Sequence, residues 1–188
     1  MISSIGAEVQ TSGIVLPIET QATATSAANS SLIISGNIGQ ILREATQNVI
    51  AVIEKLIVTK QKYIFYVQFM TAYKLKGTDS ATLAVATALY SILQGIPVKQ
   101  EVAITGGLSV QGEALPVENI SDKVHAAIEG GLKKIFVPRA NLPDIHLEKE
   151  LLGKVTIVPV ECIYDVLKEA LEWKGKQGVL KKLKRLKE

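Results

Sequence analysis

Two periods of hydrophobic and polar residues run through the chain, and each predicts one type of secondary structure. Apolar residues spaced three and four positions apart predict helices, whereas runs rich in β-branched and aromatic residues between turn-forming residues predict strands. We expect helices over residues 39–59, 80–94, 120–129 and 163–173. We expect strands over residues 13–24, 31–35, 63–70, 101–105, 108–116, 134–138 and 155–160. Because consecutive strands occur beside helix–strand alternation, this order predicts an α+β fold, a single domain of mixed sheets and helices.

The predicted helices differ in how much of their surface is apolar. One face of the 39–59 helix carries Ile41, Ala45, Val49, Val52 and Leu56, which predicts an amphipathic helix. The 80–94 helix is apolar nearly all round, so we expect it to be buried within the fold and to end at the glycine that follows. Two consecutive glycines follow the 120–129 helix and predict its C-cap.

The composition describes a folded protein that needs neither disulfides nor a structural metal. The chain has 188 residues, 47% of them hydrophobic, and a mean hydropathy of +0.25, enough for one sizeable core. The single cysteine, Cys162, excludes an internal disulfide and fits a reducing compartment. Together with His125 and His146 it shows no zinc-ligand spacing. The N-terminus lacks the pattern of a signal peptide, and no uncharged apolar run reaches the ~18 residues of a membrane span, so we expect a cytoplasmic protein.

Charge is distributed unevenly between a mildly acidic body and a basic end. Residues 174–188 carry seven Lys or Arg and one Glu, whereas residues 1–173 carry fourteen basic and seventeen acidic residues. We therefore separate a folded domain (1–173) from a basic C-terminal tail (174–188). The apolar residues of the tail repeat at helical spacing, which favours a solvated, frayed helix. Binding to nucleic acid or anionic lipid is the alternative, but the strands lack the aromatic and basic interleaving of single-strand binders, so no nucleic acid is expected.

Ser80 and Lys123 are the residues whose positions suggest chemistry. Ser80 lies where a polar turn meets the buried 80–94 helix, and Lys123 interrupts the apolar stripe of the 120–129 helix beside Ile120, Ala126 and Ala127. A serine hydroxyl attacks a carbonyl efficiently only when a base removes its proton, and lysine is such a base only when it is neutral. Burial among apolar groups lowers a lysine pKa in the required direction. The pair therefore has the parts of a Ser–Lys dyad.

The same residues have structural interpretations that the sequence leaves open. Asp79 and Ser80 before an apolar helix form a common capping pattern, and Asp79 is in a position to cap, to adjust the electrostatics of a site, or both. A lysine at the edge of an apolar stripe usually extends its amine to solvent. Other catalytic patterns are weaker, because His125 points away from Lys123 and His146 lies among charged residues. The chain also lacks the G-x-S-x-G, Walker and G-x-G-x-x-G motifs.

Several segments together resemble the proteolytic domain of Lon proteases, the Ser–Lys peptidases, and its archaeal branch in particular. The resemblance is carried by residues 35–39 (SGNIG), 78–81 (TDSA), 101–106 (EVAITG), 108–116 (LSVQGEALP) and 121–131 (SDKVHAAIEGG). These are similar to the family's T-G-x-L-G segment, its G-D-S-A nucleophile motif, its V-A-M-T-G and L-x-G-x-V-L-P block, and its K-x-x-A-A-x-x-x-G helix. The 43-residue separation of Ser80 and Lys123 is also the family's spacing.

The resemblance implies a role for each matching residue. Ser80 is the nucleophile, Lys123 the general base and Thr105 a partner that orients the amine, while backbone N–H groups around Asp79 and Ser80 form the oxyanion hole. An extended substrate would pair with the strand over residues 63–70 and the two residues after it, so the substrate-binding residues implied are Phe69, Met70, Thr71 and Ala72.

The resemblance also implies a fold, an activity and partners. The fold has a ribosomal-S5-like core, and the activity is endoproteolysis of unfolded polypeptides through an acyl-enzyme. No cofactor belongs to this chain, because ATP and Mg act only through an ATPase module that the chain lacks. Family members form six-membered rings, and full-length archaeal relatives can be membrane-anchored.

Two segments depart from the family pattern and motivate an alternative function. Gly77-Thr78 stands where archaeal relatives carry an acidic residue and a glycine, and Glu118-Asn119 replaces a Gly-Gly pair before the lysine helix. The alternative is a non-catalytic assembly or binding module on the same fold.

Overall fold

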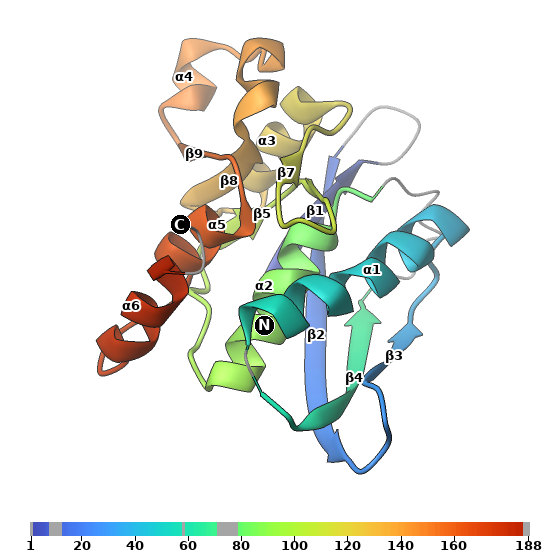
Figure 1. Cartoon of the computed structure of the whole chain (residues 1–188). Helices are drawn as coiled ribbons and strands as arrows, with labels where there is room; N and C mark the ends of the chain where they lie inside the picture. Colours follow the sequence, from blue (N-terminus) through green and yellow to red (C-terminus); the bar gives the residue numbers. More distant parts are fainter. Residues whose placement is uncertain (1, 8–12, 58, 71–78, 186–188) are drawn as a thin grey trace.

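In the computed structural model, which describes residues 2–7, 13–57, 59–70 and 79–185, one mixed sheet is flanked by helices (Figure 1). Its strands lie in the order β3-β4-β2-β1-β5-β8-β9, and a second sheet pairs β6 with β7. The strands are β1 (Ile2–Ala7), β2 (Gly13–Thr25), β3 (Ser31–Ser35), β4 (Lys62–Phe69), β5 (Val102–Ile104), β6 (Gly107–Leu108), β7 (Ala114–Leu115), β8 (Lys134–Pro138) and β9 (Thr156–Val160). The helices are α1 (Gln40–Leu56), α2 (Thr82–Gln94), α3 (Ile120–Glu129), the 3₁₀ helix η1 (Arg139–Asp144), α4 (Lys149–Leu152), α5 (Ile163–Ala170) and α6 (Gln177–Arg185).

The sheet changes from antiparallel to parallel pairing across its width. The long strand β2 pairs antiparallel with β1 through its first half and with β4 from Ile18 to Thr25. From β1 outward to β9 all pairs are parallel, as is the pair of β3 with β4 at the opposite edge. The order of elements and the mixed sheet confirm the predicted single α+β domain.

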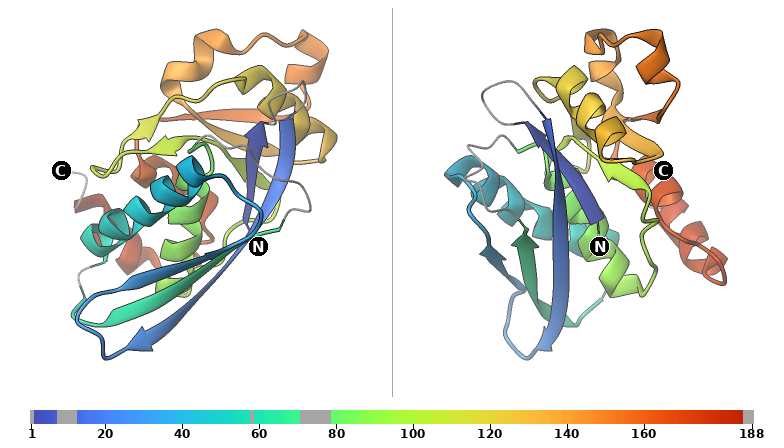
Figure 2. Two further views of the ribbon diagram at one scale, coloured as in Figure 1. Left: turned by 90° about the vertical axis from the view of Figure 1, so that its right-hand side faces the viewer. Right: turned by 180° about the vertical axis from the view of Figure 1, so that it is seen from behind.

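Strands β5 and β8 are buried on both faces, and packed layers lie on either side of them. Along β5, Val102 and Ile104 face the larger core, which contains α1 and α2, whereas Ala103 faces a second core built around α3. In β8, Phe136 faces the first core, and its two neighbours face the second. Such two-sided burial explains why these strands are continuous apolar runs in the sequence. Figure 2 shows the helices on both sides of the sheet.

Most predicted elements are confirmed, including α3, β3 and β8 at their predicted bounds. The predicted strand over 108–116 is wrong, because residues 109–113 form a turn between β6 and β7 in which the Ser109 hydroxyl accepts hydrogen bonds from the N–H groups of Gln111 and Glu113. The helix predicted over 163–173 ends at Ala170. Strand β1 was not expected from the sequence.

The predicted buried face of α1 is partly wrong. Val49 and Val52 are buried as expected, but Ile41 is 64% exposed, and Leu42 and Ile53 take its place in the core. Thr46 also lies on the buried face, where its hydroxyl donates to the Leu42 carbonyl oxygen at 2.6 Å and so is not left unpaired.

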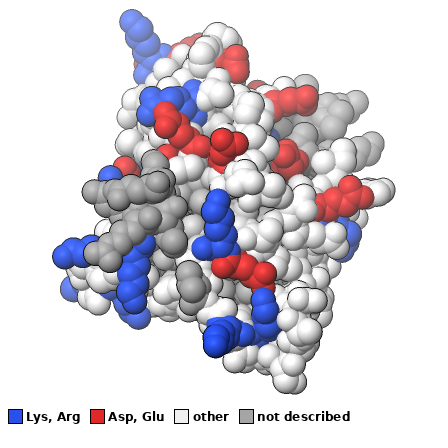
Figure 3. All heavy atoms as spheres, viewed as in Figure 1, with Lys and Arg blue, Asp and Glu red and all other residues white. Residues whose placement is uncertain are grey.

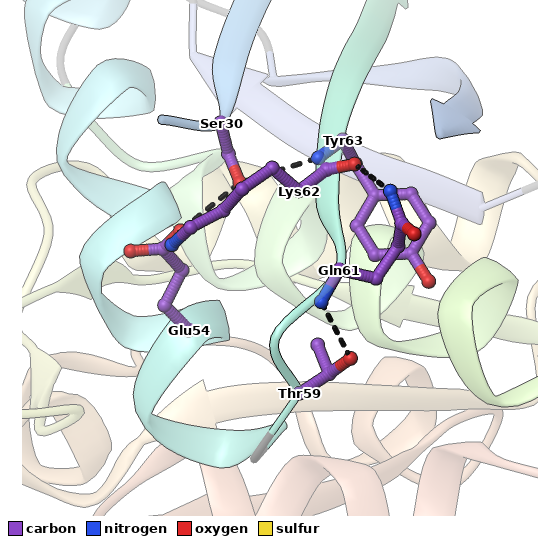
Figure 4. Close-up of polar contacts among 6 residues, drawn as sticks. All are labelled: Ser30, Glu54, Thr59, Gln61, Lys62 and Tyr63. Atoms are coloured by element: carbon purple, nitrogen blue, oxygen red, sulfur yellow. Dashed lines mark hydrogen bonds and ion pairs between the residues drawn. The ribbon is translucent and has the colours of Figure 1, made fainter. Parts of the chain in front are cut away.

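A polar cluster fixes the start of β4 against the end of α1 (Figure 4). The Glu54 carboxylate accepts hydrogen bonds from Lys62 Nζ at 2.8 Å and from Ser30 Oγ at 3.0 Å, and these two donors lower the pKa of Glu54. Gln61 joins the cluster to the end of β2, because its Nε2 donates to the Thr25 carbonyl oxygen at 3.0 Å. The cluster is exposed, so its contribution to stability is small.

The C-terminal tail forms a helix as predicted, but this helix, α6, is packed on the fold rather than fully solvated. Helix α6 packs on α5, and its Leu183 side chain is 2% exposed within the larger core. The tail is therefore part of the folded body as far as the structure describes it. In the described part of the chain, none of the helices is both long and apolar enough to span a bilayer.

Candidate active site

Ser80 lies in a tight turn at the N-terminal end of α2, with its side chain 3% exposed. The helix begins at Thr82, two residues later than the sequence predicts, and its N-cap is Ala81, so the Asp79 side chain does not occupy the capping position. The turn is held instead by Thr82, whose backbone N–H and hydroxyl both donate to the Asp79 carbonyl oxygen, at 2.9 and 2.8 Å. These bonds fix the backbone on both sides of the Ser80 hydroxyl.

Gly106 ties this turn to the end of β5. Its N–H donates to the Ser80 carbonyl oxygen at 2.8 Å, and its own carbonyl oxygen accepts the Leu83 N–H at 3.2 Å. Gly106 has φ +148, and a Cβ at this position would overlap the Leu83 side chain. Only glycine meets both conditions, so the position of Ser80 depends on this residue.

Lys123 reaches Ser80 from the other side of the sheet. Its side chain is 1% exposed on α3, on the face that the sequence predicts to be apolar. The backbone of α3 at Lys123 lies directly against the start of β2, where Gly13 leaves no room for a side chain. From this position Lys123 Nζ lies 3.5 Å from Ser80 Oγ. The two residues that the sequence singles out are therefore together, 43 positions apart in the chain.

The surroundings of Lys123 make its neutral form more accessible than that of a solvated lysine. Burial lowers its pKa from 10.5 to about 8, against the opposing effect of the carboxylates of Asp122, Glu118 and Asp79. At pH 7 a group with a pKa of about 8 is neutral in about one molecule in ten. The amine is thus available as a base near neutral pH, whereas a solvated lysine is almost fully protonated.

Thr105 and Asp79 lie in the same small region. Thr105 directly follows β5 and is fully buried, and its backbone N–H donates to the Phe136 carbonyl oxygen at 3.0 Å. The Asp79 carboxylate faces Gly107, because a Cβ at that position would come within 2.7 Å of Asp79 Oδ2. Thr105 and Gly107 are the neighbours of Gly106 in the chain, so the end of β5 lies beside both Ser80 and Asp79.

The structure describes two of the four predicted substrate-binding residues, Phe69 and Met70. Both edges of β4 are paired within the chain, with β2 through Phe69 and with β3 through Gln68, so a substrate strand cannot add along β4 itself. Phe69 is buried in the core, whereas Met70 is 44% exposed and its N–H donates to the Pro17 carbonyl oxygen at 3.0 Å. Thr71 and Ala72 lie outside the described residues, as do Gly77 and Thr78.

The two histidines do not join the site. His125 Nδ1 lies 3.7 Å from Glu129 on the exposed side of α3, and His146 is exposed. Within the described ranges, no group of three or more His, Cys, Asp or Glu residues is arranged to hold a metal ion.

The sequence analysis missed Asn141, which positions the loop before α3. Its amide is 3% exposed and pairs with the backbone of Val117, accepting the N–H at 2.8 Å and donating to the carbonyl oxygen at 2.9 Å. Asn119, two residues after Val117, adopts a left-handed conformation with φ 52, which asparagine tolerates better than most residues. Nothing in the spacing of Asn141 signals this role, because it depends on a contact between segments 24 residues apart.

Comparison with known proteins places most of the chain in one family. Residues 5–173 match the Lon protease (S16) C-terminal proteolytic domain. The archaeal Lon protease of Methanothermobacter thermautotrophicus is 43% identical over 177 residues, which are 93% of this chain and 28% of that protein. The archaeal Lon protease of Pyrococcus abyssi is 44% identical over 176 residues, 92% of this chain and 18% of the relative. The chain thus spans less than a third of the length of these curated relatives.

Proposed function

The chain belongs to the family of Lon protease (S16) C-terminal proteolytic domains and is therefore a serine peptidase domain, and we propose that Ser80 and Lys123 are its catalytic dyad. The observation that carries the proposal is the 3.5 Å separation of Lys123 Nζ and Ser80 Oγ, together with a lysine pKa of about 8. No histidine among the described residues lies beside Ser80 to act as the base instead.

The proposed reaction proceeds through an ester on Ser80. The neutral Lys123 amine takes the hydroxyl proton as Oγ bonds to the scissile carbonyl carbon, and the carbonyl electron pair moves onto oxygen. When the tetrahedral intermediate collapses, the C–N bond breaks and the Lys123 ammonium gives its proton to the leaving amine. Water then attacks the ester carbonyl carbon as Lys123 again accepts a proton. The C–Oγ bond breaks as Lys123 returns that proton to Ser80 Oγ, which releases the carboxyl product and restores both residues.

The oxyanion needs backbone donors that are not used by the fold. The N–H groups of Thr82, Leu83 and Val85 at the start of α2 all donate to carbonyl oxygens of the chain. We therefore assign the oxyanion to the N–H groups of Asp79 and Ser80, near the positive end of the α2 dipole. Thr105 would orient the Lys123 amine, and the Asp79 carboxylate would stabilise the ammonium that forms during attack.

Catalysis requires two changes at the site. Lys123 Nζ must come closer to Ser80 Oγ, and substrate must gain access to Ser80. Productive transfer occurs at roughly 2.6–3.2 Å, shorter than the 3.5 Å separation of Nζ and Oγ. Both side chains are almost fully buried, so a substrate must displace a neighbouring segment to reach Ser80. We infer that the substrates are unfolded polypeptides, and that an ATPase module and a ring of further copies deliver them. We also infer a ribosomal-S5-like core and no cofactor in this chain.

The alternative function is a non-catalytic assembly or binding module. The observation that favours it is the burial of the Ser80 hydroxyl. A fluorophosphonate probe separates the two functions, because a competent dyad is labelled covalently at Ser80 and an inert serine is not.

A peptidase assay tests the proposed dyad directly. We expect the chain to cleave a fluorogenic unstructured polypeptide slowly, and Ser80→Ala and Lys123→Ala to abolish cleavage. The matched controls are Ser26→Ala and Lys60→Ala, because both residues are exposed and lie away from the site. Cleavage that persists at the wild-type rate in the Ser80 or the Lys123 variant would refute the assignment.

A further inference from the structure

Ser121 ties the first turn of α3, the helix that carries Lys123, to the segment between η1 and α4. Its hydroxyl donates to the Asp144 carbonyl oxygen at 3.0 Å and accepts the His146 N–H at 2.8 Å. Asp144 is the last residue of η1, and Ile145, which lies between the two bonded residues, packs against the smaller core. One side chain therefore fastens the start of α3 to an anchored segment 23 and 25 residues away.

The first turn of α3 depends on these bonds for its position. The N-cap residue, Asn119, makes no side-chain capping bond within the part of the chain that the structure describes. A helix of 10 residues also has little stability of its own and relies on its contacts with the rest of the fold. A surface cavity of about 770 Å³ lies beside the turn, lined by residues 116–122, Asn141, Asp144 and His146. Because the cavity replaces part of the side-chain packing, hydrogen bonds hold the turn in place.

Ser121 and Lys123 point to opposite sides of α3. Residues two positions apart on an α-helix are separated by roughly 200° around its axis. Ser121 is half-buried and bonds to the segment after η1, whereas the fully buried Lys123 side chain reaches Ser80. The backbone between them lies against β2, since a Cβ on Gly13 would overlap the Asp122 carbonyl oxygen. Contact with β2 and the bonds of Ser121 together fix both the depth and the rotation of the helix.

We propose that Ser121 is a positioning residue for catalysis, which holds α3 so that the Lys123 amine lies within reach of Ser80. The inference rests on the proposed dyad. Lys123 Nζ lies 3.5 Å from Ser80 Oγ, and proton transfer occurs at roughly 2.6–3.2 Å, so a displacement of the helix by about 1 Å decides whether the amine acts as a base. A first turn released from Ser121 has room for such a displacement, because the cavity lies beside it.

Peptidase kinetics of the full chain test the proposal. Ser121→Ala removes both hydrogen bonds and leaves Ser80 and Lys123 unchanged. We expect kcat for a fluorogenic unstructured polypeptide to fall by about ten- to a hundred-fold, while KM changes by less than about two-fold. Labelling of Ser80 by a fluorophosphonate probe should slow by a similar factor. Ser121→Thr keeps the hydroxyl and should restore at least about half of the wild-type kcat.

The pH profile of kcat/KM separates a positioning role from a purely structural one. A loosened α3 exposes the Lys123 amine to water, so its pKa rises from about 8 toward the ordinary value of 10.5. The carboxylates that act on this amine belong to Asp122, Glu118 and Asp79, and Ser121→Ala changes none of them. Figure 3 shows acidic side chains on the upper part of this face, where α3 and the loop before it lie in Figure 1. A profile displaced to higher pH therefore reports a change in the burial of the amine.

Ser91→Ala is the matched control. Ser91 is half-buried like Ser121, and its hydroxyl also joins a helix to a neighbouring segment, because it donates to the Ile96 carbonyl oxygen at 2.6 Å. It lies near the C-terminal end of α2, the end remote from Ser80. We expect this variant to keep the wild-type kcat and the wild-type pH profile.

The outcomes separate this inference from the proposed dyad. A wild-type kcat and an unchanged pH profile in Ser121→Ala overturn the inference, as do equal losses in Ser121→Ala and Ser91→Ala or a loss that Ser121→Thr does not restore. Urea unfolding verifies that each variant is folded. Ser121→Cys, which keeps the size of the side chain and weakens both bonds, supplies the same comparison if the alanine variant fails to fold. Cleavage that persists in Ser80→Ala or Lys123→Ala instead refutes the dyad itself.

Discussion

Replacing Lys123 with methionine tests whether the proposed catalytic base lowers the stability of the fold while it supports peptidase activity. Methionine has about the same length and no charge, so Lys123→Met keeps the packing on α3 and removes the proposed base. We expect peptidase activity to fall to background and the stability of the folded chain to rise. Most mutations of buried residues have the opposite effect on stability.

The size of the gain follows from the lysine pKa. Burial lowers it from 10.5 to about 8, which corresponds to a penalty of about 3 kcal/mol at pH 7, because a ten-fold change in proton affinity is worth about 1.4 kcal/mol. Loss of the contact with Ser80 removes about 1 kcal/mol of stabilisation, which leaves a net gain of about 2 kcal/mol. For a chain of this length the melting temperature then rises by about 4–8 °C.

The dependence on pH provides the decisive measurement. Because the folded pKa of Lys123 is below its value of 10.5 in the unfolded chain, the unfolded state binds more protons between about pH 8 and 10.5, and the wild-type protein gains stability as the pH rises through this range. Urea unfolding should therefore show a gain for Lys123→Met at pH 7 that is absent at pH 10.5, where the lost contact with Ser80 outweighs the small remaining penalty of about 0.4 kcal/mol. A gain that is equal at both pH values, or a loss at pH 7, refutes the reasoning.

The remaining predictions concern the site and its supports. The kcat/KM of the peptidase should increase with pH and level off above about 8, the lysine pKa, and a profile that is flat from pH 6 to 9 contradicts the proposed base. Gly106→Ala should destabilise the chain by about 2–4 kcal/mol in urea unfolding, because it adds a clash to a strained φ, while Gly131→Ala, strained at φ +71 in open space, should cost only about 1 kcal/mol. Asn141→Leu should cost about 2–4 kcal/mol by leaving the buried backbone groups of Val117 unpaired; a cost below 1 kcal/mol contradicts that role. Glu54→Gln, in the exposed cluster, should change stability by less than about 1 kcal/mol, and a larger loss would show that the cluster contributes more than its exposure implies.

Local patterns in the sequence were sufficient for the elements that carry the dyad. The buried helix α2 and the half-apolar helix α3 both follow from residue periodicity, and the position of Lys123 on the buried face follows from its neighbours three and four residues away. The resemblance to a family then paired Lys123 with Ser80, which no local pattern specifies.

Features that depend on contacts between distant segments were not predictable. Strand β1 pairs with β2, the next strand in the chain, and with β5, about a hundred residues later, but its short sequence ISSIGA is mostly small and polar and has no distinctive local strand signal. Two further contacts also join segments that are distant in the sequence. Gly106 at the end of β5 bonds to Ser80, and Asn141 bonds to the backbone of Val117. The exposure of Ile41 was missed because the first turns of α1 bury Leu42 and Thr46, and a buried threonine is not expected from hydrophobic periodicity.

The two residues of the proposed dyad belong to different layers of the molecule. Ser80 is anchored beside α2 in the larger core, and Lys123 is carried by α3 in the smaller core across the sheet. Local unfolding of the smaller layer alone would move the Lys123 amine away from Ser80. The Ser80 hydroxyl would then keep its position but lose the proposed base. A molecule in which only the smaller layer is loosened would therefore lose peptidase activity before the larger core unfolds.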